Sequence, residues 1–145
     1  MNKLTITKHL FGALTLSAAF LFAAHVTLAA NLPDKDKQFL ADYEKIHSAL
    51  IADDLSAAQS AAKDLGDEGN DIAKASSLKD ARASFEKLSA RAKTLVMGQS
   101  GYHVFHCPML NKDWVQTSTT TANPYGGKDM APQSKQPKAI GFAFT

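Results

Sequence analysis

The chain has 145 residues, with 16 basic and 14 acidic side chains and a formal net charge of +2 at pH 7. Two of the basic residues, Lys3 and Lys8, lie in an N-terminal stretch without acidic residues, so the rest of the chain has 16 − 2 = 14 basic residues and is electrically balanced. A balanced charge gives no indication of nucleic acid or of an anionic membrane as a partner.

The first 30 residues have the three parts of a secretory signal peptide. A basic end is followed by an apolar run over residues 10–24 and by small residues, Thr27 and Ala29, at the positions before a cleavage site. We therefore predict a signal peptide over residues 1–29, cleaved after Ala29 or, as second choice, after Ala30, and export to the bacterial periplasm. The alternative is an uncleaved anchor, because the apolar stretch approaches the roughly 20 residues of a membrane-spanning helix.

Residues 30–145 have the length of one domain, and their first half has the pattern of helices. The apolar residues of the first helix recur at steps of four, three and four: Phe39, Tyr43, Ile46 and Leu50. A second helix is expected from the cap Asp54 to Gly66, and a third from the cap Ser77 to Met97, which we count as a core residue. The polar connector between them has room for a short extra turn of helix. These patterns predict a mainly α fold, a small antiparallel bundle of three or four helices over about 34–97.

The composition changes after residue 98. The segment from 99 to the end contains four of the five prolines and a threonine-rich stretch, which do not favour a long helix. We expect short extended segments at 102–107 and 114–118 in an otherwise irregular segment over 98–145. This segment should pack on the helices, because several aromatic side chains have too much apolar area to leave in water: Trp114, Tyr125, Phe142 and Phe144.

The stretch YHVFHCPMLNKDW, residues 102–114, contains the only cysteine, Cys107. A single cysteine in an oxidising compartment pairs with a partner chain, binds a metal or lies in the core. Alternation along an extended chain directs His103, Phe105, Cys107 and Met109 to one face and His106 to the other. Thiolate and thioether are soft ligands that favour Cu(I) or Ag(I), and imidazole is intermediate. The candidate metal ligands are therefore Cys107, Met109, Met130, His106, His103 and His47.

Each candidate ligand also has a structural interpretation. Cys107 could be a buried thiol, since an unpaired cysteine is among the most commonly buried residues. His106 could be a solvated loop residue, and His103 could hydrogen-bond to the backbone. His47 lies at the edge of the apolar stripe of the first helix, a position that favours a core or boundary residue over a ligand. Met130 has no evident packing role in its loop.

Four blocks in this order carry a resemblance to a known family: YEKIHSALIADDLSAAQSAAKDL, SFEKLSARAKTL, CPM and NPYGGKDM. They resemble a family of bacterial periplasmic domains of unknown function, whose members occur alone or joined to membrane-fusion subunits of copper and silver efflux pumps. The last block is similar to the Asn-Pro-Tyr-Phe-Gly-x-x-Met signature of that family. The likeness covers residues 43–130.

The resemblance implies a helical periplasmic domain associated with heavy-metal handling. It implies soft ligands at Cys107, Met109 and Met130, and four framing residues, Trp114, Asn123, Pro124 and Tyr125. Two positions depart from the family pattern. Many relatives have a second cysteine shortly after the last methionine, which is absent here, and Gly126 stands where the family has phenylalanine. The missing cysteine removes a ligand or a disulfide partner, so this member binds more weakly, uses histidine instead or has lost binding.

Together these observations predict a periplasmic binding protein for Cu(I) or Ag(I) that buffers the metal or passes it to a component of an efflux system. The alternative is a helical interaction module in which the region of Cys107 and Trp114 contacts another envelope protein or, through an intermolecular disulfide, a second copy. An enzyme is not expected, because a nucleophilic cysteine needs a base oriented by a third group, and no motif supplies that set.

Overall fold

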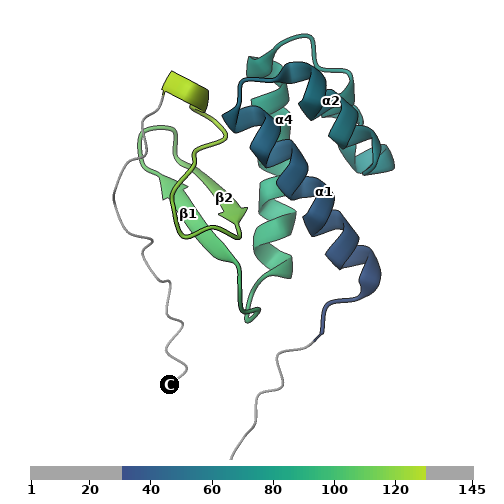
Figure 1. Ribbon diagram of the computed structural model, residues 1–145, viewed down its shortest axis with the longest axis vertical. Coiled ribbons are helices and arrows are strands. Elements are labelled where there is room, and N and C mark those ends of the chain that lie inside the picture. The colour runs from purple at the N-terminus through teal and green to yellow at the C-terminus, as the bar shows by residue number, and fades with distance from the viewer. Residues whose placement is uncertain (1–30, 130–145) are drawn as a thin grey trace, which may run out of the picture.

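The computed structural model describes residues 31–129. Within these residues the chain forms four α-helices and one two-stranded antiparallel sheet (Figure 1). The expectation of a mainly α fold is confirmed, whereas a sheet was not expected. None of the helices in this range is long and apolar enough to cross a membrane. The predicted signal peptide (1–29), Met130 and the tail aromatics Phe142 and Phe144 lie outside the described residues.

The first two helices begin and end close to the predicted positions. Helix α1 spans Asp34–Ile51. The four residues of its predicted apolar stripe are each 4% exposed or less: Phe39, Tyr43, Ile46 and Leu50. Helix α2 (Leu55–Lys63) begins at Asp54, whose Oδ1 accepts a hydrogen bond from the backbone N of Ala57 at 2.9 Å. This carboxylate satisfies one of the backbone donors that every helix N-terminus leaves unpaired.

The connector and the long fourth helix complete the helical part. A 3-10 turn, η1 (Gly66–Gly69), leads into the short helix α3 (Asn70–Ala73), and α4 (Leu78–Leu95) begins at the predicted cap Ser77. The expectation that Met97 is a core residue is wrong, because its side chain is 63% exposed. Helix α4 ends at Leu95 and Val96 takes the buried position, so the helical period no longer applies at Met97.

The second half of the described chain contains a β-hairpin. Strand β1 (His103–Cys107) pairs antiparallel with β2 (Lys112–Gln116), and Phe105 lies opposite Trp114. The first strand agrees with the expected extended segment at 102–107, whereas the second begins two residues before the expected 114. A 3-10 turn, η2 (Gly127–Asp129), ends the described chain.

The hairpin and the helices share one hydrophobic core, in which β2 lies beside α4 (Figure 1). The ring of Trp114 stacks on Phe105 with centroids 5.6 Å apart and meets Tyr125 edge-on at 6.3 Å. Across the helices, Phe85 stacks on Tyr43 at 4.7 Å. The segment after residue 98 therefore packs on the helices as far as the structure describes it, which agrees with the expectation.

Candidate metal site

Cys107 is the last residue of β1, and its side chain is buried, with 5% exposure. The predicted alternation is confirmed within the strand, since Phe105 is buried on the same side as Cys107 while His106 is exposed. The expectation that Met109 continues on the Cys107 face is wrong. Pro108 has no N–H to continue the strand pairing, so Met109 lies in the turn of the hairpin and is 70% exposed.

Two candidate histidines lie on the same hairpin but away from Cys107. The Nδ1 atom of His106 is 2.7 Å from Oδ1 of Asp113, its cross-strand partner. Burial raises the pKa of Asp113, but hydrogen bonds from Lys93 and His106 outweigh it, so the pKa is lowered overall. His103 begins the strand that Cys107 ends, four residues or roughly 13 Å of extended chain away. The structure therefore does not bring these imidazoles together with the thiol.

His47 is a buried residue of α1 with 2% exposure. Its Nε2 lies 3.1 Å from the carbonyl oxygen of Ala122, which can only accept, so Nε2 carries the proton and donates. Its Nδ1 has no hydrogen-bond partner among the described residues, and the nearest carboxylate oxygen, Oε1 of Glu44, is 3.8 Å away. Burial lowers the pKa of His47 to about 4. This environment agrees with the interpretation of His47 as a core residue that fixes the segment after β2.

The predicted framing residues 123–125 form a turn that is fixed at both ends. The side-chain Oδ1 of Asn123 accepts a hydrogen bond from the backbone N of Tyr125 at 2.9 Å. The carbonyl of the buried Pro124 accepts from Nε of Arg82 at 2.9 Å. Beyond this turn, the backbone N of Lys128 donates to Oδ2 of Asp53 at 3.0 Å. The chain is therefore held on α4 and on the connector between α1 and α2 as far as Lys128.

A buried group of hydroxyls joins the helices to β2. The hydroxyl of Tyr125 lies 3.0 Å from Oγ of Ser89 and 3.0 Å from the carbonyl oxygen of Asp113. The hydroxyl of Tyr43 lies 3.0 Å from the same Ser89 oxygen and accepts from the backbone N of Val115 at 3.0 Å. Burial raises the pKa of Tyr125 to about 12, so the phenol stays protonated. These bonds fix the strand that pairs with the Cys107 strand.

The sequence did not indicate Ser89, Arg82 or Asp53 as residues that support this region. Ser89 could have been found from the sequence, because it is a polar residue on the buried stripe of α4, four positions after Phe85. The sequence gives no such indication for Arg82 and Asp53, since charged residues at helix surfaces and helix ends are common. Their partners come from segments that are distant in sequence.

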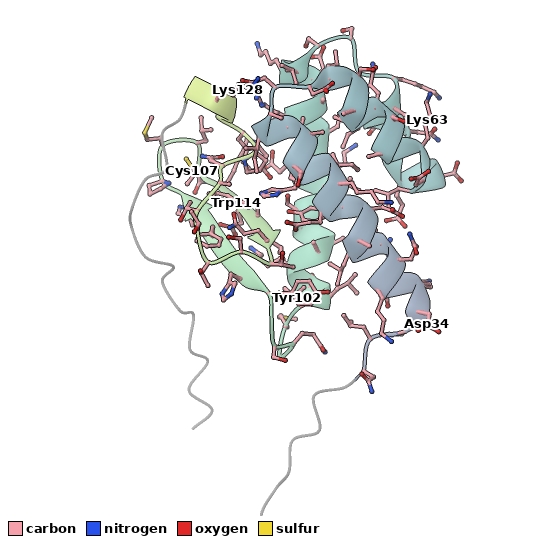
Figure 2. The ribbon with its side chains drawn as sticks, viewed as in Figure 1. Asp34, Lys63, Tyr102, Cys107, Trp114 and Lys128 are labelled. Atoms are coloured by element: carbon pink, nitrogen blue, oxygen red, sulfur yellow. The ribbon has the colours of Figure 1, made fainter. Side chains whose placement is uncertain are left out.

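The NPYGG turn lies against the start of β2, the strand that pairs with the one that Cys107 ends. Lys112 is the cross-strand partner of Cys107, and its Nζ lies 5.4 Å from the ring centroid of Tyr125. Figure 2 shows Cys107 and Lys128 toward the same end of the molecule. The NPYGG turn therefore contacts the residue that is paired with Cys107, although the two segments lie more than ten residues apart in sequence.

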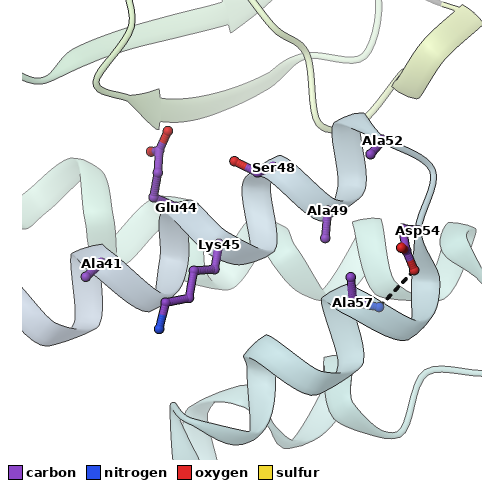
Figure 3. Close-up of a pocket in the computed structure, with 8 residues that line it drawn as sticks. All are labelled: Ala41, Glu44, Lys45, Ser48, Ala49, Ala52, Asp54 and Ala57. Atoms are coloured by element: carbon purple, nitrogen blue, oxygen red, sulfur yellow. Dashed lines mark hydrogen bonds between the residues drawn. The ribbon is translucent and has the colours of Figure 1, made fainter.

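An open groove of about 510 Å³ lies elsewhere, between α1 and the start of α2 (Figure 3). It is lined by four alanines together with Glu44, Lys45, Ser48 and Asp54. Figure 3 shows Glu44 and Lys45 pointing to opposite sides of α1, and Asp54 bonded to the backbone of its own helix. Among residues 31–129, none of the candidate sulfur or imidazole ligands lines this groove.

Across residues 31–129, no group of three or more His, Cys, Asp or Glu side chains is arranged to hold a metal ion. No family model, no curated protein and no solved structure matches the chain. The resemblance to the periplasmic domain family stays a prediction.

Proposed function

We propose that the protein binds Cu(I) or Ag(I) at the end of the hairpin, through the thiolate of Cys107 and methionine thioethers. The observation that supports this proposal is that Lys112, the cross-strand partner of Cys107, lies against Tyr125 of the NPYGG turn, with its Nζ 5.4 Å from the ring centroid. Met109 follows Cys107 in the turn of the hairpin, and Met130 follows the end of the described chain in sequence, so both are candidates for a further soft ligand. Sulfur-only coordination suits soft monovalent ions and does not suit Mg²⁺ or Ca²⁺.

The geometry supports a narrower ligand set than the six residues that the sequence suggests. His47 is bonded to Ala122 in the core, His106 is bonded to Asp113 on the exposed side, and His103 lies at the far end of the strand. The remaining candidates are Cys107, Met109 and Met130. Met109 would have to turn inward from its exposed position in the hairpin turn to reach the buried thiol, and Met130 lies outside the described residues. Burial of Cys107 also protects the thiol from oxidation in an oxidising compartment.

The biological setting of the proposal is the periplasm, where the protein would buffer the metal or pass it to a component of an efflux system without catalysing a reaction. We infer that its helices form one antiparallel bundle beneath the site. Helix α1 contacts both α2 and α4, and only three residues connect α1 to α2. Short connections of this kind are typical of antiparallel neighbours.

If the protein is exported, the position of its mature N-terminus can be predicted. When the full chain is produced in a Gram-negative host, the mature protein should begin at Ala30 or Asn31, because the basic, apolar and small-residue parts of a signal precede this point. Intact-mass measurement of the periplasmic fraction tests it. A chain that retains its first 30 residues in the membrane fraction would support the uncleaved anchor instead.

Metal binding is tested by anaerobic titration of the exported protein with Cu(I) against a competing chelator. Cys107→Ser should weaken binding by at least about a hundredfold, because a largely protonated, hard hydroxyl cannot replace a thiolate for a soft cation. Met109→Leu and Met130→Leu each remove one neutral ligand at nearly constant volume, so each should weaken binding by about tenfold. Circular dichroism of each variant should retain the helical signal of the parent.

Met97→Leu is the matched control, since Met97 is an exposed methionine at the end of α4 and not at the hairpin. It should bind Cu(I) as the parent does. If Cys107→Ser binds as tightly as the parent, the proposed site is wrong. If Cys107→Ser unfolds without metal, Cys107 is a structural thiol and the core interpretation is correct.

The alternative of an interaction module has support only from the exposed tip of the hairpin, where Met109 and Leu110 are 70% and 40% exposed. The form of this alternative that uses a disulfide through Cys107 needs an accessible sulfur, and the burial of Cys107 argues against it. Non-reducing gel electrophoresis distinguishes metal binding from a disulfide-linked interaction module. A covalent dimer that disappears in Cys107→Ser would favour the interaction module.

A further inference from the structure

His47 has one ring nitrogen that its packing in the core does not use. Its Nε2 donates to the carbonyl oxygen of Ala122 at 3.1 Å, so Nδ1 has the lone pair, and no residue of 31–129 donates to it. The rings of Tyr43 and Phe85 lie beside the imidazole, with centroids 6.5 and 6.3 Å from its own. A buried polar atom without a partner is costly, and a bound ion or water commonly explains it.

The carboxylate of Glu44 lies beside this nitrogen. Glu44 precedes His47 by three residues on α1, so the two side chains are neighbours on one face of the helix. Its Oε1 atom is 3.8 Å from Nδ1, which is too long for a direct hydrogen bond. Lys45 does not neutralise this carboxylate, because it points to the opposite side of α1 and pairs with Asp42 at 2.8 Å (Figure 3). Burial raises the pKa of Glu44, and a bound cation would offset the hydration that the carboxylate has lost.

The distance between these two atoms fits one metal ion better than one water molecule. Bonds of about 2.0–2.1 Å at a tetrahedral angle place two zinc ligands about 3.4 Å apart. Two hydrogen bonds of about 2.8 Å to one water, at the same angle, would place the two atoms about 4.6 Å apart. The observed 3.8 Å is closer to the metal geometry. The bond from Nε2 to a backbone carbonyl is also the kind that fixes the ring of most metal-binding histidines.

We propose that Glu44 and His47 form a second metal site, for Zn²⁺ or a similar divalent transition-metal ion, with Nδ1 and the carboxylate as its protein ligands and water as the others. Nitrogen and oxygen ligands suit such ions, whereas Cu(I) prefers sulfur and Mg²⁺ prefers oxygen alone. Two protein ligands are one fewer than in catalytic zinc sites, so we expect an exchangeable ion and not a structural one.

The ion has a route to the buried nitrogen. Glu44 lines the open groove beside α1, and its side chain is 34% exposed, so the movement of this one side chain opens Nδ1 to solvent. The imidazole is also in the form that a metal ligand needs. Burial lowers the pKa of His47 to about 4, so the ring is neutral at neutral pH. None of these observations depends on the proposed Cu(I) site.

Calorimetric titration of the metal-free protein with Zn²⁺ at pH 7.5 tests this site. We expect one equivalent to bind to Cys107→Ser, which lacks the only thiol that could compete for zinc. In this background Glu44→Gln should weaken binding by at least about tenfold, because a neutral amide replaces the carboxylate. His47→Gln should abolish binding, because its amide can donate to Ala122 but has no nitrogen lone pair. Mg²⁺ should not bind.

Two matched controls should bind Zn²⁺ as their parent does. Glu68→Gln removes an exposed carboxylate that pairs with Arg91, outside α1. His106→Gln removes a second imidazole that lies beside a carboxylate, that of Asp113. X-ray absorption of the zinc-loaded Cys107→Ser protein gives an independent readout. The nearest neighbours of zinc should be nitrogen and oxygen at about 2.0–2.1 Å, with the outer-shell signal of one imidazole.

A loss of affinity in Glu44→Gln that is no greater than the loss in Glu68→Gln would overturn the inference. A loss in His106→Gln would move the zinc to the hairpin and would also overturn it. So would a parent in which zinc has a sulfur neighbour and Cys107→Ser no longer binds the ion. If Cys107→Ser or His47→Gln fails to fold, the comparison of Glu44→Gln with Glu68→Gln in the parent chain decides the question.

Discussion

Replacing Trp114 by alanine should lower the free energy of unfolding by about 3–5 kcal/mol. Trp114 is 2% exposed and belongs to the core that the hairpin shares with the helices, with its ring stacked on Phe105 at 5.6 Å and edge-on to Tyr125 at 6.3 Å. Its Nε1 donates to Oε1 of Gln116 at 2.9 Å, and that amide in turn donates to the carbonyls of Ser118 and Thr120. Alanine would leave a cavity and remove the donor that orients Gln116. Urea unfolding followed by circular dichroism measures the loss.

Trp114→Phe separates the effect of the cavity from the effect of the lost hydrogen bond to Gln116. Phenylalanine keeps most of the buried aromatic area but cannot donate to Gln116, so we expect a smaller loss of about 1–2 kcal/mol. If Trp114→Ala cost less than about 1 kcal/mol, the hairpin would not share the core of the helices, and the site that we propose on it would lack a rigid support.

The helices could be predicted from sequence because the signals that set them are local. An apolar stripe of period 3.6 and the caps Asp54 and Ser77 are sufficient to begin and end α1, α2 and α4 within a few residues. Met97 shows where this reasoning fails. The buried stripe of Phe85, Leu88 and Ala92 continues to Val96, so Met97 lies off this stripe, and its apolar side chain alone was not sufficient to predict burial.

The hairpin was less predictable because pairing between strands determines where they begin and end. The segment at 102–107 has its own extended pattern, but β2 begins at Lys112 because it must pair with Cys107 across the turn. The position of Met109 depends on the same turn. Alternation predicts its direction only while the strand continues, and the strand ends at Cys107.

The sequence suggests residue types for a candidate site but not their arrangement. Spacing and composition suggest the sulfur residues together with three histidines, of which the fold bonds His47 and His106 to other partners and places His103 at the far end of β1. The meeting of Lys112 with Tyr125, and the pair of Arg82 with Asp53, join segments that are 13 and 29 residues apart in sequence. Contacts of this range have no periodic signal, so only the structure reveals them.

Acidification from pH 6.5 to pH 4 should destabilise the protein through His47 by roughly 3 kcal/mol, since the pKa of His47 falls from 6.5 to about 4 in the folded state and one pKa unit corresponds to 1.36 kcal/mol. Below pH 6.5 the unfolded chain binds a proton at this imidazole that the folded chain does not bind. Stability therefore falls as the pH falls through this window, and the loss is complete near pH 4. Urea unfolding at pH 7.5 and at pH 4.5 should show most of this loss in the free energy of unfolding.

His47→Gln isolates this contribution, because the amide can still donate to Ala122 but does not titrate. The variant should be less stable than the parent at pH 7.5 and should lose less stability than the parent at pH 4.5.

Glu44 acts in the opposite direction, since burial raises its pKa and the folded state gains stability as that carboxyl is protonated. His106→Gln, on the exposed side of the hairpin, is the control and should keep the fall seen in the parent. If the free energy of unfolding falls equally in His47→Gln and in the parent, the buried imidazole does not set the acid sensitivity. Carboxylates such as Asp42 and Asp113, whose pKa values are lowered by their partners despite burial, would then account for it.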